Sequence, residues 1–295
     1  MAGNNDSDHV PRAQESGDEP TSTRRTMLKA AGVTAVAGTG LTAVSGSASA
    51  QLFGGVDVIE IDDGGLLGGW EAEDDLPVAD ELFVFIHGWF GDTTVSSQAN
   101  DVLGAVEDGG YEPDEAVALE WPATTINFFG AESDTEYVGE VAAELIEDFY
   151  DDGGGNVRLV GHSLGGRCVL WAATKIGSSY EIETVAPLGA AADGSEVCDG
   201  PWDDATDGAV DIRNYHSEND STVGAAYGVF SDTALGNEGA PCDPDGYTDV
   251  DVTSSVGDHF AFLGDSEVGA DIAAAIEDDG DDGGGDDDDD DFGWW

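Results

Sequence analysis

A serine set between two glycines is the residue of this chain most suited to covalent chemistry. The stretch GHSLG, residues 161–165, follows the apolar run VRLV and precedes a segment whose pattern predicts a helix. A turn this tight strains the backbone of the serine, and glycines two residues away on each side avoid the clash that side chains would cause. We therefore predict that Ser163 is a nucleophile presented at the end of a strand, the alternative being an ordinary strand-to-helix turn.

The turn belongs to a longer pattern. FVFIHGWFGD (83–92) and VRLVGHSLGG (157–166) occur in an order and spacing that resemble the α/β-hydrolase superfamily, and within it lipases and esterases, over about residues 82–276. The resemblance implies a mostly parallel central sheet with helices on both faces, and a catalytic triad in the chain order serine, acid, histidine. We expect no cofactor and no metal, since no C-x-x-C or Cys/His cluster with metal-ligand spacing occurs.

A serine hydroxyl needs a base to take its proton, and histidine is the usual choice near neutral pH. Four histidines follow residue 50. His259 comes last, as the family order requires of the base, between the last predicted strand and the last predicted helix. His87 precedes the serine, and His162 is its neighbour with a side chain directed away from it. His216 lies before the best acid candidate, so we expect a structural or supporting role for it.

Position must select the acid, because 59 Asp and Glu residues follow residue 50. Asp220 lies just beyond the predicted strand VDIRNYH, where the family carries its acid. Asp193, which follows the preceding strand, is the alternative because some lipases carry the acid one strand earlier. Asp258, beside the histidine, is interpreted as a solvated neighbour. The triad predicted from the resemblance is therefore Ser163, Asp220 and His259.

An acyl-transfer intermediate also needs donors for its oxyanion. The elbow offers the backbone N–H of Leu164, and HGWFG resembles the family's oxyanion loop, whose donor is Trp89 here; the alternative for HGWFG is a plain turn. Aromatic residues after the strands either line an acyl pocket or belong to the core: Trp89, Phe90, Trp121, Phe128 and Phe129. The apolar stretch 221–236 is suited to form part of a cap.

Strands and helices alternate along the chain that must position these groups. Apolar runs predict strands at 56–61, 82–88, 116–121, 156–161, 181–188 and 209–216, and a weaker one at 248–254. Amphipathic spacing predicts helices at 134–152, at 164–177 and near the end of 256–279. This alternation favours an α/β fold with a parallel sheet and right-handed crossovers.

The two ends of the chain differ from the middle, which gives three parts: 1–50, 51–277 and 278–295. The first contains Arg24 and Arg25, a mildly apolar run and a small-residue ending, and resembles a twin-arginine export signal. Lys29 and the Gly, Thr and Ser residues make it too polar for a membrane anchor. We expect export by the twin-arginine translocase, an extracellular or cell-surface location, and no stable membrane span after processing.

The segment 278–295 reads DDGDDGGGDDDDDDFGWW, which is too charged and too rich in glycine to bury a core. We predict a disordered acidic tail after the catalytic part at 51–277. Its aromatic end, Phe292, Trp294 and Trp295, either docks on the domain or a partner, or has no function.

The chain is extremely acidic, with 8 Lys and Arg against 64 Asp and Glu and a net charge of −56. Such self-repulsion destabilises a compact chain in dilute buffer, and about 1 M salt shortens the screening length to about 3 Å. The composition resembles that of halophilic proteins, archaeal ones especially. A calcium-binding protein is the rival explanation, but no EF-hand loop occurs and the acids are spread along the chain. Nucleic acid is excluded as a partner because phosphates would meet almost no cations.

Three cysteines occur, and one of them, Cys168, falls in the apolar run after the serine, where we expect it to be buried. Cys198 and Cys242 lie in loops, and the sequence leaves open whether they pair. The resemblance implies hydrolysis of a small-molecule or lipid ester, by a lipase or an esterase. Amidase or thioesterase chemistry by the same triad stays open, as does a hydrolase fold that only binds at the cell surface.

Overall fold

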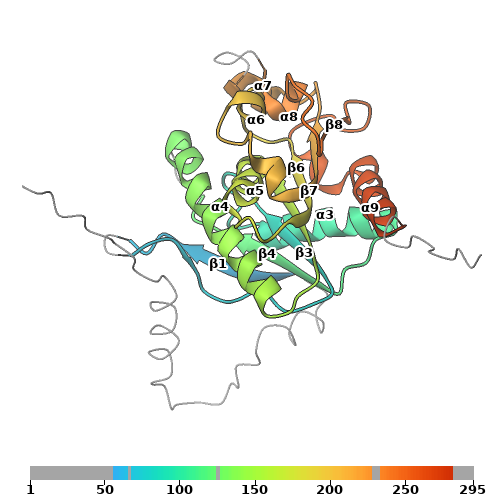
Figure 1. The fold of residues 1–295 in the computed structure, drawn as a ribbon. Helices are drawn as coiled ribbons and strands as arrows, with labels where there is room; N and C mark the ends of the chain where they lie inside the picture. The colour runs from blue at the N-terminus through green and yellow to red at the C-terminus, as the bar shows by residue number, and fades with distance from the viewer. Residues whose placement is uncertain (1–55, 66–67, 124–126, 228–232, 282–295) are drawn as a thin grey trace, which may run out of the picture. The chain divides into compact units, whose positions relative to one another are not determined.

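Eight strands form one sheet in the computed structural model, which describes residues 56–65, 68–123, 127–227 and 233–281 (Figure 1). All of these residues fall in the second of two units, Ser45–Trp295, into which the chain divides. The segment 1–50 with its predicted export signal lies outside the described residues, as do Phe292, Trp294 and Trp295.

The sheet has the strand order β2-β1-β4-β3-β5-β6-β7-β8, and every neighbouring pair is parallel except β1 with β2. The strands are β1 (Asp57–Asp62), β2 (Glu71–Ala72), β3 (Glu81–Ile86), β4 (Glu115–Glu120), β5 (Asn156–His162), β6 (Ile182–Leu188), β7 (Ala209–His216) and β8 (Tyr247–Asp251). The mostly parallel α/β architecture expected from the sequence is confirmed.

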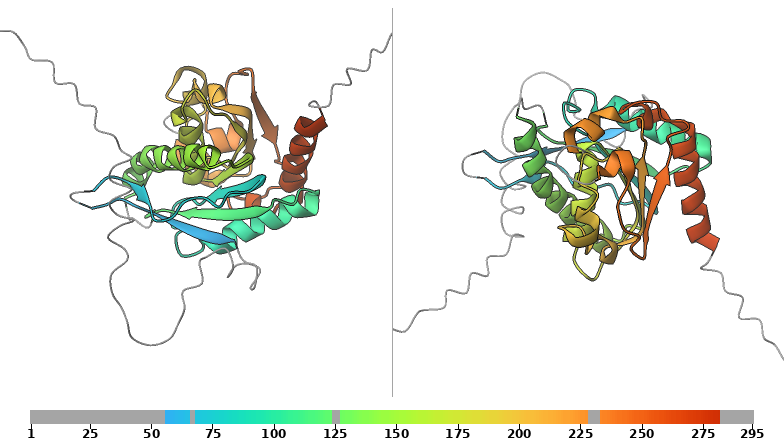
Figure 2. Two further views of the ribbon diagram at one scale, coloured as in Figure 1. Left: turned by 60° about the horizontal axis from the view of Figure 1, so that its bottom comes forward. Right: turned by 90° about the horizontal axis from the view of Figure 1, so that it is seen from above.

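In the described part of the chain, long helices cover both faces of the sheet (Figure 2). One face carries α4 (Phe128–Asp151) and α5 (Leu164–Lys175), and the other carries α3 (Val95–Gly109) and α9 (Ser266–Asp281). Shorter helices lie in the connections: α6 (Glu196–Asp199), α7 (Ser221–Tyr227), α8 (Leu235–Glu238), and the 3-10 turns Ala205–Asp207 and Ala261–Gly264. Among the described residues, no helix is both long and apolar enough to cross a membrane.

Strand β3 shows why its sequence is apolar throughout. Leu82, Val84 and Ile86 pack in the core beneath α4 and α5, whereas Phe83 and Phe85 pack beneath α3 and α9, and all five are fully buried. Successive side chains of a strand point to opposite faces, so a strand covered on both sides is apolar at every position. At the centre of the sheet, β3 is therefore packed between apolar side chains on both of its faces.

The helices differ from expectation at three places. Helix α4 begins at Phe128, six residues before the predicted start, and α9 continues to Asp281, beyond the predicted boundary at 277. Helix α3 was not predicted, although its buried residues Val95, Ala99, Val102 and Val106 have helical spacing. Its polar and small residues between these positions weaken the signal in the sequence.

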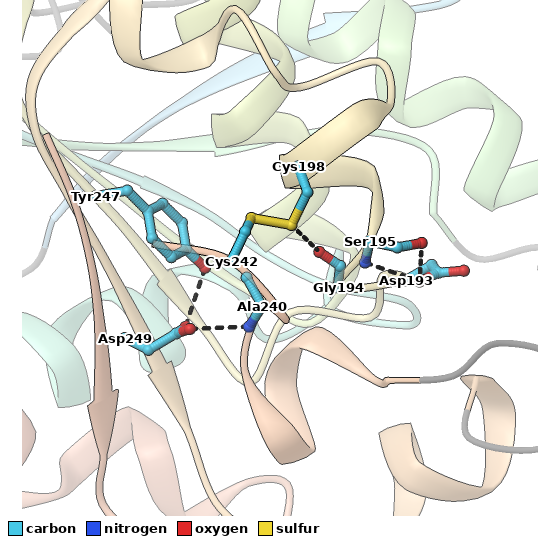
Figure 3. Close-up of a disulfide and its surroundings, with 8 residues drawn as sticks. All are labelled: Asp193, Gly194, Ser195, Cys198, Ala240, Cys242, Tyr247 and Asp249. Atoms are coloured by element: carbon cyan, nitrogen blue, oxygen red, sulfur yellow. Dashed lines mark hydrogen bonds between the residues drawn. A yellow bond between two sulfur atoms is a disulfide. The ribbon is translucent and has the colours of Figure 1, made fainter. Parts of the chain in front are cut away.

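Cys198 and Cys242 form a disulfide with a Cα–Cα distance of 5.9 Å (Figure 3). It joins α6, which follows β6, to the loop that precedes β8, across a sequence separation of 44 residues. Cys168 is free and buried in α5, as its apolar surroundings predict. The pairing that the sequence left open therefore joins the connection after β6 to the connection before β8.

Candidate active site

The turn between β5 and α5 has the strained geometry that its glycine spacing predicts. Ser163 lies at φ 59° and ψ −118°, a region that residues with side chains rarely occupy. A Cβ atom on Gly161 would lie 2.2 Å from the carbonyl oxygen of Gly165, and one on Gly165 would lie 2.1 Å from that of Ile86. Glycine is therefore required at 161 by the backbone of the helix that follows, and at 165 by the backbone of β3.

Hydrogen bonds to the next strand hold this turn in place. The N–H of Ser163 donates to the carbonyl of Leu188 at the end of β6, over 3.0 Å. Its own carbonyl accepts from the N–H groups of Gly166 and Ala191, each at 3.0 Å. These bonds offset the backbone strain and fix the direction of the serine side chain.

The structure brings the three predicted triad residues into one chain of hydrogen bonds. The Oγ of Ser163 lies 2.9 Å from Nε2 of His259, and Nδ1 of His259 lies 2.7 Å from Oδ2 of Asp220. The exposed fractions are 7% for the serine and the histidine and 0% for the aspartate. With Nδ1–H donating to the carboxylate, Nε2 accepts from the serine hydroxyl, which is the arrangement that removes its proton.

Asp220 lies just beyond β7 and is fixed by its own loop. Its Oδ1 accepts the backbone N–H groups of Thr222 and Val223, each at 3.1 Å. The alternative acid, Asp193, accepts instead from the N–H and hydroxyl of Ser195 (Figure 3). Of the two acids considered from the sequence, the structure places Asp220 against the histidine.

The strained serine turn lies at the centre of a parallel sheet, with an acid after β7 and a histidine after β8 in hydrogen-bonding order. The chain has the α/β-hydrolase fold. Asp258, next to the histidine, is exposed, and its carboxylate accepts the nearby N–H of Phe260, in line with a solvated neighbour.

Neither a family model nor a curated protein sequence matches this chain. Solved structures resemble it at low identity. The Trichoderma reesei cutinase in complex with a phosphonate inhibitor is 13% identical, covers 79% of this chain and 84% of its own, and has a TM-score of 0.38. The mature Bacillus licheniformis lipase BlEst2 is 18% identical, with coverages of 69% and 94% and a TM-score of 0.41. MenH from S. aureus is 11% identical, with coverages of 70% and 97% and a TM-score of 0.42.

His87 holds the loop that the α/β-hydrolase pattern assigns to the oxyanion. Its Nε2 accepts the backbone N–H of Trp121 at 3.1 Å, so its Nδ1 carries the proton and donates to the carbonyl of Gly88 at 2.7 Å. The C=O and N–H of one peptide unit point in opposite directions, so this bond also orients the N–H of Trp89. Burial lowers the pKa of His87 to about 4, which keeps the ring neutral near pH 7.

His162 supports the loop that carries His259. Its Nε2–H donates to the backbone carbonyl of His259 over 2.8 Å, and the two imidazole centroids lie 4.7 Å apart. Burial lowers the pKa of His162 to about 3, with the neighbouring His259 acting in the same direction. A neutral ring at this place adds no positive charge beside the histidine that must receive a proton.

A cavity of about 370 Å³ opens above the serine and has mostly apolar walls. Trp89, Phe90 and Phe128 line it, together with Val223 and Phe260. Of the other aromatic candidates, Trp121 is buried in the core and Phe129 is 72% exposed. Of the five aromatic candidates, three therefore line the cavity, one lies in the core and one is exposed.

Sequence reasoning missed the supporting roles of His87 and His162 and the placement of Phe260 and Val223 in the cavity wall. The rarity of histidine could have drawn attention to both residues. Only four histidines follow residue 50, and three of them lie at this site. His216 has no described contact with the triad, in line with a structural role. In the described part of the chain, no group of three His, Cys, Asp or Glu side chains has the geometry to hold a metal ion.

Proposed function

We propose that this protein is a serine hydrolase that cleaves carboxylic esters through an acyl-enzyme intermediate. The observation that carries the proposal is the contact of Ser163 with Nε2 of His259 at 2.9 Å on the wall of an apolar cavity. Asp220, at 2.7 Å from the opposite nitrogen, holds the imidazole in the tautomer that accepts a proton.

In the first half of the reaction, Oγ of Ser163 attacks the ester carbonyl carbon while its proton passes to Nε2 of His259. The backbone N–H groups of Leu164 and Trp89 stabilise the oxyanion that forms. The tetrahedral intermediate collapses, the bond to the alcohol oxygen breaks, and His259 returns its proton to that oxygen. The alcohol leaves, and the acyl group stays on the serine as an ester.

In the second half, water takes the place of the alcohol. His259 removes a proton from the water, whose oxygen attacks the acyl carbon, and the second tetrahedral intermediate releases the carboxylic acid as Ser163 regains its proton. The apolar walls formed by Trp89, Phe128 and Val223 favour an uncharged acyl chain over a polar one. The proposed substrate is accordingly a neutral ester of a small molecule or a lipid.

A fluorophosphonate probe tests the proposal directly. Incubated with the protein in concentrated salt, the probe should form a covalent adduct on Ser163, identified by mapping the labelled peptide. The expected adduct is lost in His259→Ala, because the hydroxyl then has no base to activate it. A folded sample that takes up no label, or that carries the label on a different serine, would contradict the proposed nucleophile.

We also propose that the protein is exported by the twin-arginine pathway and works outside the cell in concentrated salt. The supporting observations are the paired residues Arg24 and Arg25 and the net charge of −56. After residue 50 only four basic residues remain: Arg158, Arg167, Lys175 and Arg213. Each of these four cations lies within 4 Å of a carboxylate, so all four form ion pairs with acidic side chains.

Dialysis from molar salt into dilute buffer should therefore unfold the protein. Removing the counterions lengthens the range of repulsion among the acidic side chains, and the compact state loses more than the expanded one. Far-UV circular dichroism along a salt titration measures this, and restoration of salt is the control for reversibility. An identical spectrum at both ends of the titration would refute the salt adaptation.

A further inference from the structure

Helix α7 forms one wall of the cavity. It begins at Ser221, immediately after the triad aspartate, and its residues Thr222 and Val223 line the space above the serine. The first turn is fixed because the carboxylate of Asp220 accepts two of its backbone N–H groups. The position of this wall then depends on what holds the far end of the helix.

The far end of α7 is bound to helix α4 through a side chain. The hydroxyl of Tyr227 donates to Oε1 of Glu132 at 2.6 Å. Its ring packs edge-on against Phe128, with centroids 6.4 Å apart, and Phe128 itself lines the cavity. Tyr227 therefore joins two helices that both contribute residues to the wall of the cavity.

A buried cation holds the glutamate in turn. Arg167 lies one turn after the nucleophile in α5 and is only 9% exposed. Its Nη1 lies 3.5 Å from Oε1 of Glu132 and 3.6 Å from Oε2 of Glu196. Its Cζ atom lies over the ring of Trp202, 4.9 Å from the ring centroid. Arg167 is one of only four Lys and Arg residues after residue 50, and it lies between two carboxylates beside the site.

We propose that Tyr227, Glu132 and Arg167 position α7 and thereby set the length of acyl chain that the cavity accepts. These are positioning residues, since none of the three lines the cavity. The inference rests on the proposed ester hydrolysis. Short acyl groups lie near the serine, where the bonds from Asp220 fix the wall, whereas longer ones extend toward the part of the wall that Tyr227 holds.

A second ion pair between α5 and α4 provides a matched control. Lys175 lies 2.7 Å from Glu136, which joins α5 to α4 beyond the Arg167 contact, and both side chains are considerably exposed. Neither residue has a described contact with α7. Replacing Lys175 removes a helix-to-helix ion pair without touching the cavity wall.

The test compares Tyr227→Phe with Lys175→Met on an acetyl ester and an octanoyl ester of the same alcohol, in concentrated salt. Tyr227→Phe removes one hydroxyl that bonds to a carboxylate, and should raise KM for the octanoyl ester by about tenfold. The acetyl ester should keep kcat and KM within about twofold, and Lys175→Met should alter neither ester. Equal changes for both esters, or no change for either, would overturn the proposal.

Hydrogen exchange separates this inference from the proposed function. Amides of α7 should exchange faster in Tyr227→Phe than in the parent protein or in Lys175→Met, because the end of the helix has lost its contact with α4. This result stands even if the protein hydrolyses no ester, in which case only the proposed activity fails. Unchanged exchange of the α7 amides would overturn the positioning role whatever the substrate.

Discussion

Replacing Ser163 with alanine should lower kcat for ester hydrolysis by about six orders of magnitude and leave the fold intact. The hydroxyl is the group that lies 2.9 Å from the imidazole of His259, so its loss removes the covalent route altogether. Alanine fits the same strained turn, and the bonds from Leu188 and Ala191 to its backbone remain. Steady-state rates and circular dichroism of the purified variant, both in concentrated salt, measure the two parts of this prediction.

Two further variants make the serine prediction specific. His259→Ala should be as inactive as Ser163→Ala, and the double variant should be no worse, because the two side chains act as one unit. Ser221→Ala is the matched control: this exposed serine follows the triad aspartate directly and should keep its full rate. Retention of more than about one per cent of the rate by folded Ser163→Ala would show that another nucleophile carries the reaction.

Replacing Asp220 with asparagine should lower kcat by about four orders of magnitude. An asparagine amide that donates to Nδ1 of His259 holds the imidazole with its proton on Nε2, and this tautomer cannot accept the proton of the serine. The substitution is nearly isosteric, and its side-chain oxygen can still accept the N–H groups of Thr222 and Val223. The variant should therefore fold normally while turnover falls, as rate measurements beside a thermal melt would show.

Asp193→Asn is the comparison that decides between the two acids. Asp193 bonds to Ser195 in a loop beside the disulfide, so its replacement should keep nearly full turnover. If Asp193→Asn instead loses turnover while Asp220→Asn keeps it, the acid assignment is wrong. Because both variants remove one negative charge from a chain of −56, a general effect of charge would affect them alike.

The proposed substrate range depends on helix α7, whose first turn and last residue are held by different contacts. The carboxylate of Asp220 serves both the imidazole and the first turn of α7, so the triad and the near wall form one hydrogen-bonded unit. At the other end, the hydroxyl of Tyr227 bonds to the carboxylate of Glu132. This division is why a change at Tyr227 is expected to act on KM for long acyl chains and to leave the chemical step unchanged.

The elbow and the strands could be predicted from the sequence because each leaves a local pattern of residue types. A serine that must lie in a strained turn needs glycine at 161 and 165, where a Cβ atom would meet backbone oxygens at 2.2 Å and 2.1 Å. A strand buried on both faces must be apolar at each position, as Leu82 to Ile86 are. Such constraints leave a pattern within a few residues of the chain, even where the contact behind them, as between Gly165 and Ile86, joins distant segments.

Other features were decided only by contacts between distant segments. Asp193 and Asp220 both follow strands of the same sheet, and the choice between them depended on how the loop carrying His259 folds back, 39 residues after Asp220. The same holds for the pairing of Cys198 with Cys242, and for the bond from His162 to the backbone of His259. No periodic pattern in the sequence indicates which loops pack against one another.

The sequence by itself determined the parallel α/β architecture, the strained serine and the extreme acidity, because each follows from steric limits or composition along the chain. The tertiary structure placed the predicted acid, Asp220, against the histidine. It alone decided which aromatic residues line the cavity and that Tyr227 reaches Glu132 across 95 residues of sequence. The physical reason is that hydrogen bonds and ring contacts depend on distances in space, and loop packing sets these distances without leaving a local signature.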